Sequence, residues 1–178
     1  RTDFDCFVGV DRGSLWVLEE KLPLALAVGD FDSVTAEERH LIQKRAQHFV
    51  QAQPEKDDTD LELALLTIFE KNPQAQVTIF GALGGRIDHM LANVFLPSNP
   101  KLAPYMRQIE IEDEQNLIRY CPEGTSQLEP WSDYDYLAFM PVRDSQLTII
   151  GAKYELTEEN FFFKKVYASN EYIDREVS

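Results

Sequence analysis

Acidic side chains follow two apolar segments of this 178-residue chain, and their spacing indicates chemistry on a charged substrate. Asp30 and Asp32 alternate in "GDFDS", so in an extended segment both carboxylates would point to one side. Asp57, Asp58 and Asp60 stand together in "KDDTD", where adjacent carboxylates repel one another unless a cation lies between them. Carboxylate oxygens suit Mg²⁺, which fills its other positions with water and phosphate oxygens. The spacing therefore favours a metal and a phosphorylated substrate.

Each acidic motif also has a purely structural explanation. Thr59 and Glu62 have the spacing of a capping box, and Asp60 would suit the positive end of a helix dipole, so the second motif could be a solvated helix start. "GDFDS" could be a turn followed by a helix cap. Capping leaves Asp57 and Asp58 unexplained, whereas a bound cation accounts for both.

A glycine-rich segment, "GALGGRIDH" (81–89), could hold phosphates at the start of a helix. Gly84 and Gly85 would let backbone N–H groups approach phosphate oxygens closely, and Arg86 could add a bidentate contact. A tight strand-to-helix turn with Asp88 in the first helical turn would use the same residues. His89 could be catalytic, although a surface histidine at a helix start fits equally well.

The order of apolar segments predicts how these motifs are positioned. Short buried strands are expected at 6–10, 24–28, 48–51 and 76–80. Helices are expected between them and after the last, at about 15–22, 35–47, 59–69 and 87–95. This alternation predicts an α/β fold with an open, mostly parallel sheet, whose ligands bind beyond the carboxyl ends of the strands. Asp11 and all three motifs follow such ends.

A proline-rich segment, "LPSNPKLAP" (96–104), interrupts the pattern, and we place a domain boundary there. Residues 1–98 would form the α/β catalytic domain. Residues 99–178 contain short, often alternating apolar segments separated by turn residues, which predict a small all-β sandwich domain.

Composition narrows the possible partners. The net charge of −14 argues against nucleic acid or an anionic membrane as the main partner, because both require a basic face. Cys6 and Cys121 show no CxxC spacing, which is typical of a cytoplasmic protein with reduced thiols. The sequence shows no signal peptide, no apolar run of membrane-spanning length, no GxxxxGK[ST] and no GxGxxG. We expect natural residues before Arg1, since the chain begins without methionine.

Taken together, "GDFDS", "KDDTD", "GALGGRIDHMLANV" and the late "SNE" (169–171) resemble thiamine pyrophosphokinases of the bacterial type, over essentially the whole chain. The resemblance implies an α/β catalytic domain followed by a β-sandwich domain, in a homodimer with shared active sites. It also implies Mg²⁺-dependent transfer of pyrophosphate from ATP to the hydroxyl of thiamine, with Mn²⁺ as a possible substitute, giving thiamine diphosphate and AMP.

The resemblance assigns roles to residues at matching positions. It implies metal binding by Asp30, Asp32, Asp58 and Asp60. Catalytic roles are implied for Asp30, Asp32, Asp58, Arg86 and Asp88. Contacts with ATP or substrate are implied for Asp11, Ser33, Asp57, Asp60, Gly84, Gly85, His89 and Asn93. The thiamine pyrimidine would meet Ser169 and Asn170, which belong to the partner subunit.

The sequence departs from the family pattern in the last part of the chain. The family commonly has glycines just before "SNE", where this chain has "FFFKKVYA", so the local backbone is expected to differ. Two other functions fit the motifs less well. One is another metal-dependent phosphotransferase or phosphohydrolase, and the other is a thiamine- or nucleotide-binding module without turnover, which would have little use for so many carboxylates.

Overall fold

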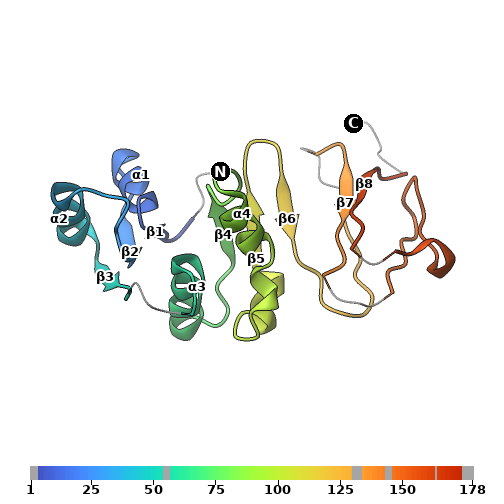
Figure 1. Ribbon diagram of the computed structural model, residues 1–178, viewed down its shortest axis with the longest axis horizontal. Helices are drawn as coiled ribbons and strands as arrows, with labels where there is room; N and C mark the ends of the chain where they lie inside the picture. Colours follow the sequence, from blue (N-terminus) through green and yellow to red (C-terminus); the bar gives the residue numbers. More distant parts are fainter. Residues whose placement is uncertain (1–3, 54–56, 130–133, 143–145, 163, 174–178) are drawn as a thin grey trace.

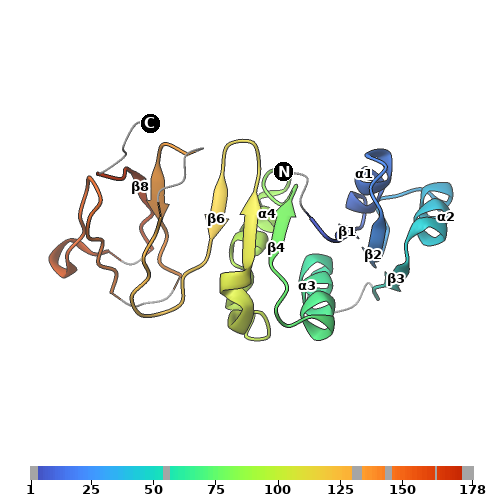
Figure 2. The ribbon, with the colours of Figure 1, turned by 180° about the vertical axis from the view of Figure 1, so that it is seen from behind.

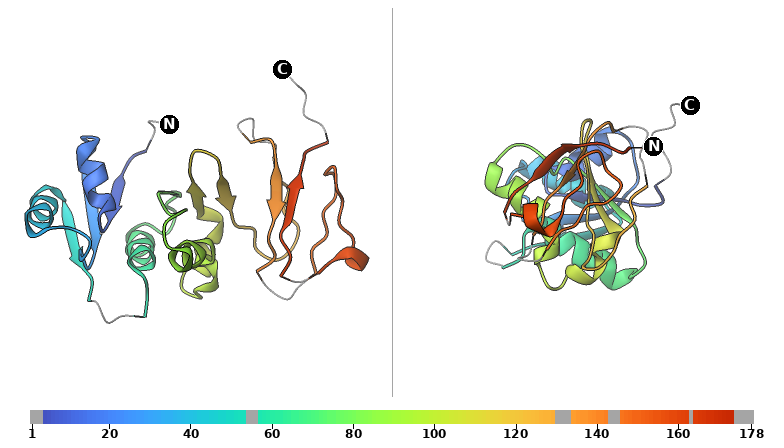
Figure 3. Two further views of the ribbon diagram at one scale, coloured as in Figure 1. Left: turned by 45° about the horizontal axis from the view of Figure 1, so that its top comes forward. Right: turned by 90° about the vertical axis from the view of Figure 1, so that its right-hand side faces the viewer.

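A computed structural model gives the arrangement of the chain. Figure 1 shows the elements following the long axis almost in chain order, from blue helices and strands at one end to orange and red strands at the other. Figures 2 and 3 show the same order from other directions. The structure describes residues 4–53, 57–129, 134–142, 146–162 and 164–173.

The first sheet, sheet A, has three parallel strands in the order β1-β2-β3. They are β1 (Phe7–Val10), β2 (Leu24–Gly29) and β3 (His48–Gln51). Helices α1 (Gly13–Glu19) and α2 (Ala36–Arg45) connect them. These elements agree with the predicted strand–helix alternation, and they bring the carboxyl ends of all three strands to one edge.

Helices cover both faces of sheet A. Leu24 and Ala27 pack with Leu15 of α1 and Ile42 of α2. The alternate residues Leu26 and Val28 instead pack against Ala64, which belongs to α3 (Asp60–Lys71). Burial on both faces explains why β2 is continuously apolar.

Two of the helices begin at capping boxes, and the spacing of Thr59 and Glu62 predicts one of them. The Thr35 hydroxyl accepts a hydrogen bond from the Glu38 backbone N–H, and the Glu38 carboxylate accepts one from the Thr35 N–H. Thr59 and Glu62 form the same reciprocal pair at the start of α3. Capping therefore accounts for Thr59 and Glu62, and leaves the three aspartates of that motif for other contacts.

The second sheet, sheet B, has the order β4-β5-β6. Its strands are β4 (Val77–Phe80), β5 (Ile109–Glu112) and β6 (Leu117–Arg119). β4 and β5 are parallel, whereas β5 and β6 are antiparallel. One face packs on α3, where Leu65 and Phe69 join Ile79, Ile109 and Ile111 in the largest buried cluster. Helix α3 therefore packs against both sheets.

The sequence grouped the segments of β5 and β6 with the β-rich domain, but both strands extend sheet B through β4. The alternation of Ile109 and Ile111 indicates a strand with one buried face, but it does not specify the sheet to which that strand belongs. The expected single open sheet consists of two three-stranded sheets in the described residues. The domain boundary at residues 98 and 99 stays a prediction.

The β-rich part contains β7 (Leu137–Phe139) and β8 (Tyr167–Asn170), which pair antiparallel. Two isolated bridges, Ile149 with Leu156 and Ala152 with Tyr172, add to this pair. A small core of Ile149, Ala152 and Leu156 lies beneath them. The fold is thus mixed α/β with a parallel sheet in the catalytic part and a separate small β domain.

Three short 3₁₀ helices complete the described elements. They are η1 (Leu96–Ser98), η2 (Ala103–Gln108) and η3 (Glu158–Asn160), while α4 (Ile87–Val94) follows the glycine-rich segment. Within the described ranges, no helix combines the length and the apolar character that a bilayer crossing requires.

Candidate functional site

Three carboxylates converge at the edge of sheet A. Asp11 follows β1, Asp30 follows β2, and Asp60 begins α3, which comes after β3. One oxygen from each of them lies within 4.8 Å of the others, and all three residues are partly buried. We call Asp11, Asp30 and Asp60 the acid triad. Three converging oxygen ligands can hold a divalent cation such as Mg²⁺.

Two neighbouring loops fix the Asp11 carboxylate within the triad. Its Oδ1 accepts a hydrogen bond from the backbone N–H of Phe31 at 3.1 Å, which joins the loops that follow β1 and β2. A side chain at Gly29 would place its Cβ 1.9 Å from the same oxygen, so only glycine permits this approach. Asp11 and Phe31 both have positive φ, at 46° and 59°. Such backbone strain is typical of functional sites.

The electrostatics of the triad favour binding of a cation. The pKa of Asp11 is raised to about 6, mainly by burial and also by the carboxylates of Asp60 and Asp30, while the hydrogen bond from the Phe31 N–H opposes the shift. Like charges this close disfavour simultaneous ionisation unless a positive charge joins them. The resemblance implies metal binding by Asp30, Asp32, Asp58 and Asp60, and a substrate contact for Asp11. The structure brings Asp11 together with Asp30 and Asp60.

The other acids of the two motifs lie outside the triad. Asp32 is exposed, and its backbone N–H donates to Asp30 Oδ1 at 3.0 Å. Asp57 is also exposed, and Lys56 of the same motif lies outside the described residues. Asp58 forms an ion pair with Lys101 at 2.7 Å and accepts a hydrogen bond from the Asn99 amide at 3.1 Å.

Asn99 and Lys101 were missed because they lie in the proline-rich segment that we interpreted as a domain boundary. Asn99 also donates to Glu62 Oε1 at 2.9 Å, so it connects that segment to the first turn of α3. Their signal in the sequence is weak. Two polar residues among prolines are also common in solvated loops.

The glycine-rich segment forms an exposed turn between β4 and α4. Gly81, Gly84 and Gly85 have φ of 73°, 105° and 68°, a region that favours glycine. Arg86 then pairs with Asp88 at 2.6 Å, and a second hydrogen bond joins Arg86 Nε to the same carboxylate. This pair is open to solvent and available to a phosphate.

Neighbouring residues support this turn. The Asn93 amide donates to the Ala82 carbonyl at 2.9 Å, which connects α4 to the turn. His89 is exposed, and its backbone N–H donates to Asp88 Oδ1. A Cβ on Gly81 would lie 3.1 Å from the Trp16 ring of α1, so the turn passes close to the helix that follows Asp11.

Ser33 is exposed beside the loop of Asp30, and its backbone carbonyl accepts a hydrogen bond from Arg12 at 3.2 Å. Arg12 also lies 3.9 Å from Glu38 of α2. A cationic side chain therefore lies next to the loop that carries two of the candidate acids.

Ser169 and Asn170, at the end of β8, differ strongly in exposure. Ser169 is exposed and has a positive φ of 59°. Asn170 is buried, and its Oδ1 accepts hydrogen bonds from the backbone N–H groups of Tyr154 and Glu171, while Nδ2 donates to the Tyr154 carbonyl. Among the described residues, the Asn170 amide therefore holds the backbone of Tyr154 and Glu171, and Ser169 is the more accessible of the two.

The acid triad and Ser169 lie far apart along the molecule. Figure 1 shows sheet A, in blue, toward one end of the long axis and β8, in red, toward the other, and Figure 2 agrees from behind. Within one chain, the two groups of candidate residues therefore lie far from each other.

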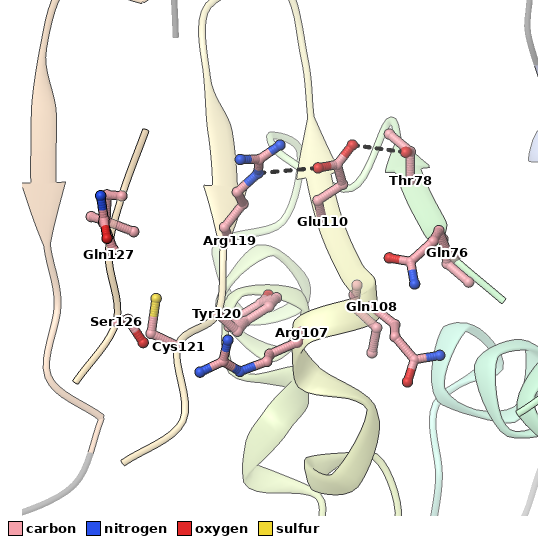
Figure 4. A pocket seen from close by; sticks show the side chains of 13 residues that line it. Gln76, Thr78, Arg107, Gln108, Glu110, Arg119, Tyr120, Cys121, Ser126 and Gln127 are labelled. Carbon is pink, nitrogen blue, oxygen red and sulfur yellow. Dashed lines mark hydrogen bonds and ion pairs between the residues drawn. The ribbon is translucent and has the colours of Figure 1, made fainter. Parts of the chain in front are cut away.

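A separate hollow of about 350 Å³ lies on the polar face of sheet B. Figure 4 shows Glu110 between Thr78 and Arg119, with a hydrogen bond to Thr78 Oγ1 at 2.9 Å and an ion pair to Arg119 at 3.2 Å. Among the described residues, the candidate residues from the sequence do not line it. The hollow is therefore distinct from the acid triad.

Comparison with protein families matches most of the chain in two parts. Residues 2–108 match the catalytic domain of thiamin pyrophosphokinase, and residues 125–178 match the vitamin B1 binding domain of thiamin pyrophosphokinase. Together the two matches follow the order of the two parts of the structure.

Individual relatives agree with these matches. Thiamine pyrophosphokinase of Bacillus subtilis is 39% identical over 152 residues, which cover 84% of this chain and 70% of that protein. A thiamin pyrophosphokinase family protein from Enterococcus faecalis has 47% identity and a TM-score of 0.87, over 96% of this chain and 81% of that one. The solved Bacillus subtilis enzyme has 36% identity and a TM-score of 0.76, over 97% and 81%.

Proposed function

The chain belongs to the thiamin pyrophosphokinase family, and we propose from this premise how its residues carry out the reaction. The enzyme transfers the pyrophosphate group of ATP to the hydroxyl of thiamine, giving thiamine diphosphate and AMP. ATP and thiamine are therefore its substrates. We propose the identity of the metal, the roles of the site residues and the oligomeric state.

The proposed metal site is the acid triad, with Mg²⁺ as its natural occupant and Mn²⁺ as a substitute. The single observation that carries it is the convergence of three carboxylate oxygens within 4.8 Å at the edge of a parallel sheet. When bound, the cation supplies neutralisation of the negative charge on the transferring phosphates. Asp11, Asp30 and Asp60 would hold it, and in this proposal Asp30 also takes the proton of the thiamine hydroxyl.

The remaining acids and the glycine-rich turn are proposed to bind and orient ATP. The exposed Arg86–Asp88 pair would exchange part of its mutual contact for a phosphate oxygen on Arg86. Gly84 and Gly85 offer backbone N–H groups on the same turn. The proposed supporting contacts come from the exposed or partly buried polar residues nearby: Asp32, Ser33, Asp57, Asp58, His89 and Asn93.

We also propose a homodimer with shared active sites, and the position of Ser169 supports it. If the acid triad and Ser169 act on one thiamine, their separation along the molecule requires that they come from different chains. A two-fold dimer would then contain two identical composite sites, each with the triad of one subunit and β8 of its partner.

A cytoplasmic location is proposed from the two cysteines. Cys6 and Cys121 are both free and exposed, and exposed thiols persist in a reducing compartment.

Metal dependence provides the test of the proposed site. The protein should convert thiamine and ATP to thiamine diphosphate and AMP with Mg²⁺ or Mn²⁺, and should stop in excess EDTA, as followed by mass analysis of the products. Full activity in EDTA would contradict the metal site. Release of ADP or free phosphate instead of AMP would contradict the reaction.

A further inference from the structure

The hollow on the polar face of sheet B is large enough to bind a complete small molecule. Its volume of about 350 Å³ lies within the range of about 300–1,000 Å³ that is typical of ligand sites. Its floor crosses β4, β5 and β6, and residues 126–128 form one side of it (Figure 4). The described residues that line it belong neither to the acid triad nor to the glycine-rich turn. The hollow is therefore a separate candidate site.

Glu110 lies at the floor of the hollow with both carboxylate oxygens engaged. Oε1 accepts a hydrogen bond from the Thr78 hydroxyl at 2.9 Å, and Oε2 accepts one from Arg119 Nε at 3.2 Å. Figure 4 shows these contacts running across the three strands of the sheet. Because the Arg119 guanidinium offsets its charge, the Glu110 carboxylate repels an anion much less than an unpaired carboxylate would.

Arg107 supplies a cationic group to the same hollow. It lies in the last turn of η2 and is exposed, and it forms no ion pair with the residues that the structure describes. Figure 4 shows its guanidinium extending below the Tyr120 ring, toward the side of Cys121 and Ser126. A guanidinium binds the oxygens of an anion through parallel N–H bonds. In a chain of net charge −14, this arginine marks the hollow as a place for an anion.

Two further hydrogen-bonding groups lie on opposite sides of the hollow. The Ser126 hydroxyl oxygen is buried, and it has no hydrogen-bond partner in the described part of the chain. Buried hydroxyls normally have a partner, so this one is available to a ligand oxygen. Figure 4 shows Gln76 on the other side, beyond Glu110, where its amide offers both donors and an acceptor. The hollow thus has an anion-binding end and a neutral polar end.

Contacts outside the hollow hold its walls in place. Gln108 Nε2 donates to the carbonyls of Pro73 and Ala75 at 2.9 and 2.8 Å, which fixes the end of η2. The Tyr120 hydroxyl donates to the Asn93 carbonyl at 3.2 Å, and burial raises the pKa of Tyr120, so this donor stays protonated. Walls that are formed in advance lower the cost of ordering side chains on binding.

We propose that the hollow on sheet B is a phosphate site separate from the acid triad, and that it binds a small phosphate ester. The phosphate lies between Arg107 and Ser126, and the polar body of the ester extends across β5 toward Gln76. A tetrahedral phosphate meets a guanidinium and a hydroxyl from different directions, whereas one guanidinium satisfies a planar carboxylate. A free phosphate ion would leave the end at Gln76 without a partner.

Two phosphate esters are products of the reaction, AMP and thiamine diphosphate, and both have this chemistry. The choice of these two probes rests on the proposed function, whereas the site itself rests on the lining of the hollow. The two esters differ in the body that would meet Gln76, so a binding experiment with both distinguishes them.

The thiol of Cys121 lines the hollow and gives a measurement that does not depend on turnover. The chain has two cysteines, so a Cys6→Ser background leaves Cys121 as the single thiol. Its reaction with iodoacetamide, an uncharged reagent, is followed by mass spectrometry in EDTA, which keeps metal from the acid triad. Saturating AMP or thiamine diphosphate should slow this reaction by at least about 5-fold, and acetate should slow it by less than about 2-fold.

Substitutions at the hollow identify where protection arises. Arg107→Ala should raise the half-protecting concentration of the ester by about 10-fold, and Ser126→Ala should raise it by about 3-fold. Arg45→Ala, which removes an exposed arginine at the end of α2, is the matched control and should change nothing. Arg86→Ala should also keep full protection, because the glycine-rich turn lies outside the hollow.

Protection by either ester that depends on Arg107 supports the proposal, and the ester that protects at the lower concentration is the preferred ligand. No protection by either ester would overturn it, as would equal protection in wild type and Arg107→Ala. Inorganic phosphate or acetate that protects at a lower concentration than both esters would overturn the assignment to a phosphate ester. Loss of protection leaves the proposed function intact, and a protected protein that releases no AMP from thiamine and ATP would refute that function alone.

Discussion

The acid triad and the cavity of about 220 Å³ where β7 and β8 meet, the β7–β8 cavity, are both lined by carboxylates, but they differ in what stands beside these groups. In the triad, the oxygens of Asp11, Asp30 and Asp60 converge within 4.8 Å in a partly buried site. In the cavity, Asp135 and Glu171 are accompanied by the phenol rings of Tyr136 and Tyr172. Convergent oxygens suit a small, hard ion such as Mg²⁺.

The proposed function divides the work between the two parts of the enzyme. In this proposal the α/β part would hold ATP and the metal, where developing phosphate charge must be neutralised. The β-rich part would hold thiamine, whose charge does not change during the reaction. Changes in the first region should therefore reduce turnover, and changes in the second should reduce thiamine affinity.

The largest expected effect is that of Asp30→Asn. Loss of a metal ligand should lower the rate of AMP release by roughly 1,000-fold, because the charge of the transferring group is no longer neutralised. Thiamine binding, measured by calorimetry, should change little. Asp5→Asn, an exposed aspartate before β1, is the matched control and should keep normal activity. Near-normal turnover in Asp30→Asn would remove the distinction between the two regions.

A smaller effect is expected from Arg86→Ala. The loss of one charge-assisted contact to phosphate should raise the KM for ATP by about 10-fold, while the KM for thiamine stays constant. Folding stability should hardly change, because the pair with Asp88 is fully exposed. Arg45→Ala, at the end of α2, makes the same change in charge and serves as the control. A rise in the KM for thiamine alone would contradict the assignment of Arg86 to ATP.

The smallest effect concerns pH and stability in the absence of metal. The pKa of Asp11 is about 6 in the folded protein, against an ordinary value of 3.8. The folded state therefore holds this proton more tightly, so its stabilising contribution is complete below pH 3.8 and is lost as pH rises through about 6. In EDTA, the free energy of unfolding of the wild-type protein should fall by about 1 kcal/mol more than that of Asp11→Asn as pH rises through this range.

Urea denaturation of both proteins at several pH values measures that difference. Added Mg²⁺ should stabilise wild type above pH 6 and should do much less for Asp11→Asn, because binding to the folded state shifts the equilibrium. Identical pH dependence in the two proteins would show that Asp11 ionises normally in the fold.

Much of the α/β part could be predicted from the sequence. The apolar run of β2 and the two capping boxes specify their elements locally, and the parallel-strand rule predicts which acids share an edge. The contacts that decide roles within the site are long-range. Asp58 meets Lys101 across 43 positions, and local spacing carries no information on such a pair. The parallel topology also does not predict which of the acids at one edge of the sheet converge.

The β-rich part was less predictable for a physical reason. Its segments alternate only weakly, so their pairing depends on neighbours that the local pattern does not specify. Motif matching placed Asn170 at the thiamine site, and only the folded chain reveals that its amide is used to hold Tyr154 and Glu171. The local pattern likewise did not predict that β5 pairs with β4.

The claim that one active site is built from two subunits is tested most directly by mixing two defective variants. Asp30→Asn should disable the acid triad, and Asn170→Ala should release the backbone of Tyr154 and Glu171 next to Ser169, with folding of each checked by circular dichroism. The two proteins are unfolded and refolded together, and AMP release is measured after heterodimers are confirmed. Random pairing makes half of the dimers mixed, and each mixed dimer regains one intact site, so activity should recover to about a quarter of wild type. No recovery in confirmed heterodimers would contradict a shared site, because every site formed within one chain would still contain a defect.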